Sequence, residues 1–236
     1  MSINVCYSQR PGAGDPALAV AANQMLNYTT NVSFDMYKYT LDKTTRDQYE
    51  SNPLFENNVY RYEDFTIARI SNIKDPKLIR YNLVNDEVEV KMKDNVYAVD
   101  KNDMYNEFLI EKTGERIRFL PYIDKNGTET KGYLFEVYSD KDFTLYKKIY
   151  SKFIEPKELK SGFETQKPFG FINQEPLYFF ASTYTDKINY LPEKKNKLAS
   201  LFPEKDEKIR KIIRESKVSF SDQRSIINLL KEIHNH

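Results

Sequence analysis

The sequence predicts a mainly β protein of the α+β class: an antiparallel β-meander, open or partly closed into a barrel, with a short N-terminal helix and C-terminal helices packed on it. Three observations support this class. Between residues 65 and 154, short segments rich in β-branched and aromatic residues alternate with turn residues. Residues 191–236 carry apolar residues at helical spacing. The chain of 236 residues also contains 18 Tyr and 15 Phe, which are enriched in sheets.

The first eight residues, MSINVCYS, are interpreted as the remnant of a signal peptide whose start lies upstream of Met1. Cys6 and Ser8 place small side chains where a signal peptidase would inspect them if it cut before Gln9, although the basic start and the apolar run of a signal are missing. An ordinary cytosolic N-terminus and a lipidated Cys6 are the alternatives. Cleavage would leave a mature chain without cysteine, which core burial must stabilise without disulfides.

Residues 9–64 are expected to form a helix, a strand and an irregular segment. An Asp-Pro pair before ALAVAANQML is a cap followed by proline at the first helical position, which predicts a short helix over 16–27. Over residues 31–41, alternation with a change of phase predicts a strand that contains a bulge or is covered on both faces. Residues 43–64 are polar and rich in tyrosine without a clear period, so we expect them to run over the surface.

Residues 65–190 are predicted to form the antiparallel meander. Asn, Asp and Gly separate successive segments, and these residues tolerate the positive φ of tight hairpins. The predicted strands are FTIARI, KLIRYNLV, EVEVKM, NVYAV, EFLIE, RIRFLPYI, GYLFEVY and FTLYKKIY. Residues 156–176 interrupt this pattern, and PLYFFAST with KINYLP then predict one more hairpin that returns to the sheet.

Residues 191–236 are predicted to form a helical tail of three segments. Pro192, Pro203 and the pair Ser221-Asp222 are start signals for these helices. The apolar stripes of the helices consist of Leu198, Leu201, Phe202, Ile209, Ile212, Ile213, Ile226, Ile227, Leu229, Leu230 and Ile233. One face of the meander is the simplest surface for them to cover, and docking of a partner helix is the alternative.

Composition and motifs exclude several classes of function. A net charge of +1 gives no overall field that would attract nucleic acid. The longest apolar stretch, ALAVAA at residues 17–22, is far shorter than the roughly 20 residues that cross a bilayer. The two histidines, His234 and His236, stand at the end of the chain, where we expect fraying, so triads and zinc sites lack their usual ligands. The glycine-rich phosphate-binding motifs are absent.

The acidic residues are interpreted as solvent-exposed. Asp86, Glu87 and Glu89, and likewise Asp140 and Asp142, lie in predicted turns or alternate with apolar residues along strands, which is typical of a solvated face. A pair of catalytic carboxylates, as in a glycosidase, stays as an alternative. The sequence therefore predicts no catalytic, cofactor-binding or metal-binding residues, and it leaves the binding residues unassigned.

Two segments approach known motifs without matching them. Residues 124–128 begin like a calcium loop, but the glycine comes too early and Phe135 stands where the bidentate glutamate belongs, so we predict a hairpin turn. Residues 131–138, KGYLFEVY, approach the RNA-stacking strand of an RNA-recognition motif, but two residues break the pattern. Tyr133, Phe135 and Tyr138 are expected to pack within the sheet instead.

Three further segments resemble a family of uncharacterised exported envelope proteins of Bacteroidota, especially of flavobacteria. They are YNLVNDEVEV (residues 81–90), LYKK (residues 145–148) and LFPEKDEKIRKIIRESKVSF (residues 201–220). The resemblance implies export to the envelope and a β-rich body with a helical tail. Because these motifs are structural, the resemblance implies no active site.

The leading hypothesis is a non-enzymatic exported protein of the periplasm or outer membrane that binds another envelope protein, as an accessory subunit of an outer-membrane complex. A sheet edge, the tyrosine-rich segment or the helical tail would supply its surface, since Tyr combines an apolar body with a polar tip. One alternative is a module that binds a glycan or small ligand on a concave β surface, which the absence of Trp disfavours. The other is a carboxylate-dependent hydrolase. No cofactor, nucleic-acid partner or transmembrane segment is predicted.

Overall fold

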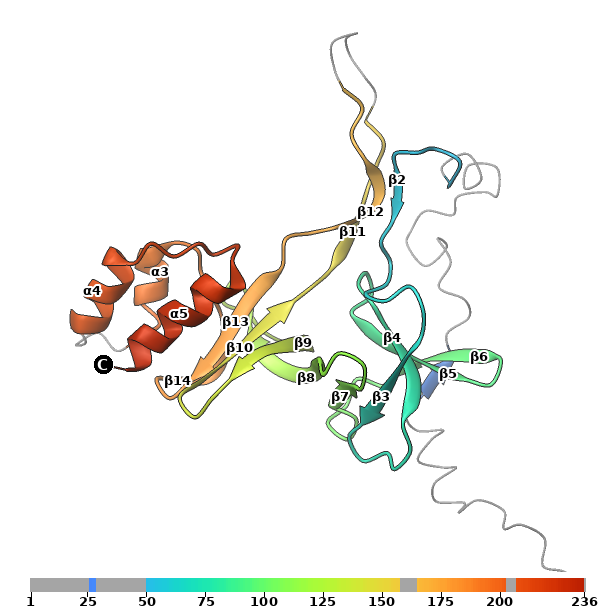
Figure 1. Ribbon diagram of the computed structural model, residues 1–236, viewed down its shortest axis with the longest axis horizontal. Helices are drawn as coiled ribbons and strands as arrows, with labels where there is room; N and C mark the ends of the chain where they lie inside the picture. Colours follow the sequence, from blue (N-terminus) through green and yellow to red (C-terminus); the bar gives the residue numbers. More distant parts are fainter. Residues whose placement is uncertain (1–25, 29–49, 158–164, 203–206, 236) are drawn as a thin grey trace, which may run out of the picture.

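The structure is a computed structural model that describes residues 26–28, 50–157, 165–202 and 207–235. These residues form an eleven-stranded sheet, a three-stranded sheet and three C-terminal helices (Figure 1). The prediction of a mainly β protein of the α+β class is thereby confirmed.

The N-terminal predictions are tested only in part. The predicted remnant at 1–8, the predicted strand over 31–41 and most of the predicted helix over 16–27 lie outside the described residues. The predicted C-terminal end of that helix was wrong, because Leu26–Tyr28 forms strand β1, antiparallel to β6 (Asn95–Val99). Pairing with the edge of a sheet outweighs the local helical spacing there, as tertiary contacts often do.

Residues 66–110 build a four-stranded meander and one added strand. The elements are β3 (Thr66–Ile70), β4 (Lys77–Asn82), β5 (Glu87–Met92), β6 and β7 (Glu107–Ile110). Their order is β1-β6-β5-β4-β3-β7, because β7 pairs with β3 rather than with β6. Asp86 and Lys93 both have φ 55° in the tight turns, in agreement with the predicted turn chemistry. The predicted strands are confirmed. The prediction that each strand pairs with the next one along the chain was wrong at β7, which pairs with β3.

Five strands close into a small barrel. They are β8 (Arg116–Ile123), β9 (Glu129–Ser139), β10 (Phe143–Lys148), β13 (Leu177–Ser182) and β14 (Thr185–Tyr190). Neighbours in this ring pair antiparallel, except where Asn189 of β14 pairs with Ile123 of β8 in parallel and closes it. The first residues of β8 also pair with β7, so β8 belongs to both halves of the large sheet. The predicted partly closed barrel is confirmed, and residues 65–190 are more than a meander.

A three-stranded sheet extends from the body (Figure 1). It has the order β11-β12-β2, with β11 (Ser151–Ile154), β12 (Phe169–Asn173) and β2 (Phe55–Asn57), and β12 runs parallel to β2. The sequence predicts an irregular segment over 43–64 and an interruption of the meander over 156–176, whereas β2 and β12 lie within these two ranges. Gly170, at φ +101°, lies so close to β2 that an added Cβ would come within 2.4 Å of the Glu56 carbonyl oxygen, so only glycine permits this pairing.

The C-terminal helices cover the outside of the barrel, as predicted (Figure 1). They are α3 (Lys195–Ala199), α4 (Glu207–Glu215) and α5 (Gln223–His234). Asp222 caps α5 by accepting hydrogen bonds from the backbone N–H groups of Arg224 and Ser225. The helices bury their apolar stripes against β10 and β13, through Phe143, Leu145, Tyr178, Phe180, Leu198, Ile209, Ile213, Ile226, Leu230 and Ile233.

His234 is packed rather than frayed. Its Nδ1 lies 2.7 Å from the carbonyl oxygen of Leu230, and its ring centroid is 5.1 Å from that of Phe143 and from that of Tyr184. The expectation of a loose chain end was therefore wrong at this residue, because two aromatic rings enclose it. His236 lies outside the described residues.

One face of the large sheet carries the exposed Ile67 and Leu78 and the buried Glu89 in the N-terminal half, and it becomes the interior of the barrel. This follows from the direct pairing of β7 with β8, which places Glu107 opposite Arg118 on the same face. The other face forms a core between the N-terminal half and the outside of β8 and β9. Edge-to-face aromatic contacts join Tyr81 to Tyr133 and Phe135 in this core. Tyr133 and Phe135, which belong to the segment 131–138, therefore pack within the sheet as predicted.

Candidate functional site

The turn between β4 and β5 carries Asp86 to one end of the barrel. Its Oδ2 lies 2.8 Å from the Nζ of Lys148 and 3.4 Å from the backbone N–H of Tyr133, which donates to it. Its Oδ1 accepts a hydrogen bond of 2.5 Å from the hydroxyl of Tyr81. A Cβ on Gly132 would lie 2.7 Å from Oδ2, so a larger residue there would force the Asp86 carboxylate to move. Asp86 lies in a turn as predicted, but it joins the two halves of the sheet and does not simply face solvent.

Glu89 is buried, although the alternation along β5 predicts a solvated position. Its side chain is 0% exposed, its Oε2 lies 2.8 Å from the Nε of Arg80, and its Oε1 accepts from the amide of Asn82 at 3.2 Å. Arg80 also donates to the hydroxyl of Tyr60 at 2.9 Å. Burial raises the pKa of Tyr60 to about 12, with Glu89 raising it further and Arg80 opposing. The prediction was wrong because Arg80 stands directly opposite Glu89 on β4 and neutralises it.

Glu87 lies two residues before Glu89 on β5 and is half-buried. Burial raises the pKa of its carboxyl group, and the positive charge of Lys101 opposes that shift. Hydrolysis by two carboxylates needs two acids that can take separate roles across a substrate. Glu89 is already held by Arg80, so Glu87 and Glu89 do not form such a pair.

Asp124 and Asp140 stabilise turns, whereas the carboxylate of Asp142 lies 4.0 Å from the Nζ of Lys141. Asp124 accepts hydrogen bonds of 2.8 Å from the backbone N–H groups of Thr128 and Asn126, which lower the pKa of its carboxyl group. Asp140 accepts in the same way from the backbone N–H groups of Asp142 and Phe143. Residues 124–128 therefore form the hairpin turn that the sequence predicts.

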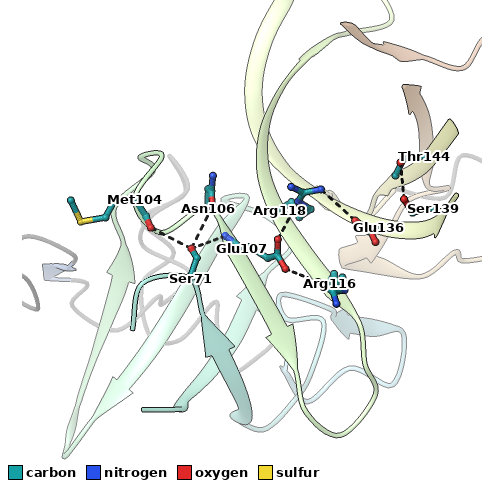
Figure 2. Close-up of polar contacts among 9 residues, drawn as sticks. All are labelled: Ser71, Met104, Asn106, Glu107, Arg116, Arg118, Glu136, Ser139 and Thr144. Atoms are coloured by element: carbon teal, nitrogen blue, oxygen red, sulfur yellow. Dashed lines mark hydrogen bonds and ion pairs between the residues drawn. The ribbon is translucent and has the colours of Figure 1, made fainter. Parts of the chain in front are cut away.

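A row of alternating charges crosses from the N-terminal half into the mouth of the barrel (Figure 2). Glu107 of β7 lies 2.7 Å from the Nη1 of Arg116 and 3.5 Å from the Nε of Arg118, both on β8. The Nη1 of Arg118 lies 3.5 Å from the carboxylate of Glu136 on β9. We call these four residues the charge ladder. Sequence reasoning missed it, because each residue alone resembles an ordinary surface charge and only the strand register brings them together.

The interior of the barrel is filled. Leu134, Tyr146, Phe179 and Tyr122 point into it and are all less than 8% exposed. Arg118 and Glu136 lie at one end of this interior, and Lys148 lies with Asp86 at the other. A barrel of this kind is a packed core, with an ion pair at each end.

Exposed apolar side chains continue the face of the charge ladder onto β3 and β4. Ile67 and Leu78 are direct cross-strand partners and are 49% and 42% exposed. Met104, also exposed, lies beside the start of β7, where the hydroxyl of Ser71 contacts the Met104 carbonyl oxygen at 3.3 Å and accepts from the Glu107 amide at 3.2 Å (Figure 2). We call Ile67 and Leu78, together with the charge ladder, the ladder face.

The ladder face combines exposed apolar side chains with paired charges. Both of its carboxylates lie within 3.5 Å of an arginine nitrogen. Apolar side chains bordered by charges of both signs are the usual anatomy of a protein interface. Among the described residues, no group of three or more His, Cys, Asp or Glu is placed to hold a metal ion. None of the described helices has the length and apolar character needed to cross a membrane.

Comparison of the chain with protein-family models, with curated proteins and with solved structures found no match.

Proposed function

We propose that this protein is a non-enzymatic exported envelope protein that binds another protein through the ladder face, as an accessory subunit of an outer-membrane complex. The observation that carries the proposal is the exposed cross-strand pair Ile67 and Leu78, on the same face of the sheet as the charge ladder. The solvated face of an antiparallel sheet is normally polar, so adjacent exposed apolar side chains on it suggest a surface that another protein covers.

The filled barrel supports a surface function over the binding of a ligand in a cavity. Tyr122, Leu134, Tyr146 and Phe179 occupy the interior, and ion pairs close both of its ends. The lack of Trp also removes the usual stacking platform for a sugar. A glycan-binding role is accordingly the weaker proposal.

The charge ladder defines the chemistry of the partner. Two glutamates and two arginines balance one another, so the partner surface should be apolar at its centre with charges of both signs around it. On association, the apolar pair would lose contact with water, which stabilises a complex by about 25 cal/mol for each Å² of apolar area removed. The ion pairs would then mainly set register and specificity.

A site-specific cross-linker tests this proposal. The photoreactive amino acid p-benzoylphenylalanine is placed at position 67 in the source cell, and at position 125 in the exposed β8–β9 turn as the matched control. We expect one discrete adduct from position 67 only, and we expect Leu78→Thr to reduce its yield at least about threefold, because about 1 kcal/mol of apolar burial is lost.

Three outcomes would contradict the proposal. Equal labelling from positions 67 and 125 would show that the ladder face is not a specific surface. An adduct of twice the chain mass would assign this face to self-association. Recovery of the adduct from the cytosol after cell fractionation would remove the envelope location.

A further inference from the structure

The groove between α3 and α4 carries two arginines one helical turn apart. Arg210 and Arg214 of α4 form one wall, and Asn196, Ala199 and Ser200 of α3 form the other, around a volume of about 260 Å³. None of the described residues that line this groove is acidic. The two helices lie side by side at the end of the molecule that is far from the N-terminal half of the sheet (Figure 1).

The walls of the groove are held in place without a ligand. Leu198 of α3 packs with Ile209 and Ile213 of α4 in one buried cluster. The ammonium group of Lys195 donates a hydrogen bond of 2.9 Å to the carbonyl oxygen of Arg214 and another to that of Ser216, which ties α3 to the C-terminal end of α4. A ligand would therefore bind to a preformed site and would not have to order it.

The arginine pair is not neutralised within the described part of the chain. Neither Arg210 nor Arg214 forms an ion pair with another described residue, and the Nε of Arg210 is buried without a hydrogen-bond partner there. Like charges four residues apart on a helix repel each other. The whole helical tail is also basic, since residues 191–236 contain eleven Lys and Arg against seven Asp and Glu, while the chain as a whole is nearly neutral.

We propose that this groove binds the phosphate group of a soluble ligand. The fork of N–H donors on each guanidinium matches the oxygens of a phosphate in paired hydrogen bonds, and such an anion would also relieve the repulsion between the two arginines. The amide of Asn196 adds a neutral donor on the opposite wall. At about 260 Å³ the groove is smaller than the roughly 300–1,000 Å³ of sites for drug-sized ligands, so it fits the phosphate end of a molecule.

Titration of the full chain with inorganic phosphate at constant ionic strength tests this assignment. Arginine Nε–Hε resonances report binding by NMR in the wild type, in Arg210→Gln and in Lys211→Gln, a control that removes the same charge from an exposed position of the same helix. We expect saturable shifts in the wild type and the control. In Arg210→Gln the Kd should rise at least about tenfold, because paired charge-assisted bonds are lost. Arg214→Gln, at an exposed position, gives the same readout if Arg210→Gln does not fold.

Shifts that rise linearly with phosphate, equally in all variants, would show an adventitious ion only and overturn the proposal. A second arm uses vesicles of phosphatidylcholine with and without phosphatidylglycerol in a sedimentation assay. Sedimentation with the anionic vesicles, without saturable binding of inorganic phosphate, would assign the basic tail to a membrane surface and likewise overturn it. Saturable phosphate binding without sedimentation is the expected result.

Discussion

The carboxylate of Asp86 and the ammonium group of Lys148 lie 2.8 Å apart, and their contact joins the N-terminal half of the large sheet to the end of the barrel. Asp86 occupies the β4–β5 turn at φ 55°, a left-handed conformation that Asp and Asn tolerate better than most residues. Lys148 is the last residue of β10. Both side chains are less than a quarter exposed, so each depends on the other for compensation of its charge.

Removal of both partners should therefore destabilise the fold by less than the sum of the two single removals. We expect Asp86→Asn, which keeps the turn conformation, and Lys148→Met each to lower the free energy of unfolding by about 2 kcal/mol. The double variant should lose at least about 1 kcal/mol less than the sum of the two. Urea unfolding of all four proteins measures this coupling.

The exposed ion pair of Lys187 with Glu129 provides the control for this double-mutant cycle of Asp86 and Lys148. Both of its side chains are more than half exposed, so Lys187→Met should change stability by no more than about 0.5 kcal/mol. Additive effects of Asp86→Asn and Lys148→Met would mean that the contact does not join the two halves of the sheet.

Gly132 should be sensitive to the addition of a single methyl group. In Gly132→Ala the new Cβ would meet Asp86 Oδ2 at 2.7 Å and Lys148 Nζ at 3.1 Å, so the turn must move away. We expect a loss of about 1–3 kcal/mol in the free energy of unfolding, as for other overpacked sites. In an Asp86→Gly background, which removes the carboxylate and keeps the positive φ, the same methyl group should have less than half that effect. An equal loss in both backgrounds would place the strain elsewhere.

The strands and helices were predictable from sequence because their signals are local. The alternation in EVEVKM and the Asp222 cap before QRSIINLL each lie within a few residues, and both predictions are confirmed. Strand β12 was missed because it is short, contains Gly170 and lies between prolines, so its pairing with β2 has no local signal. The parallel closure of the barrel likewise depends on a contact between Ile123 and Asn189, which are distant in sequence.

The candidate site was not predictable, because it depends on strand register. Glu89 reads as a solvated residue in EVEV, and it is buried only because Arg80 comes to lie opposite it. In the same way, Glu107, Arg118 and Glu136 come from three separate strands. Alternation along one strand predicts which residues share a face of the sheet. It does not predict which charged residues of neighbouring strands lie next to them on that face.

Two buried tyrosines should respond in opposite directions to loss of the hydroxyl group. The hydroxyl of Tyr133 has no hydrogen-bond partner among the described residues, whereas that of Tyr81 donates to Asp86. A buried polar group without a partner is unfavourable, so Tyr133→Phe should raise the free energy of unfolding by about 1 kcal/mol. Tyr81→Phe should lower it by about 1 kcal/mol or more, because Asp86 loses a donor. Urea unfolding at neutral pH distinguishes the two, and a loss of stability in both would mean that the Tyr133 hydroxyl is satisfied.

The same tyrosines predict a loss of stability at alkaline pH. Burial raises the pKa of Tyr81 and of Tyr133, with the charge of Asp86 adding to both shifts, and the pKa of Tyr60 is raised to about 12. Below pH 10, the ordinary value for tyrosine, these phenols are neutral in the folded and unfolded chains, so their contribution is fully present. As the pH rises further, the unfolded chain ionises first, and that contribution is lost.

Each such tyrosine should contribute a slope of about −1.4 kcal/mol per pH unit to the free energy of unfolding between pH 10 and its folded-state pKa. Tyr133→Phe should remove one of these contributions. Urea unfolding between pH 7 and pH 11.5 should therefore give curves for wild type and Tyr133→Phe that run parallel up to about pH 9.5 and then diverge, with the variant falling less steeply. Parallel curves over the whole range would mean that Tyr133 ionises in the folded protein, and thus that the aromatic core around it admits water.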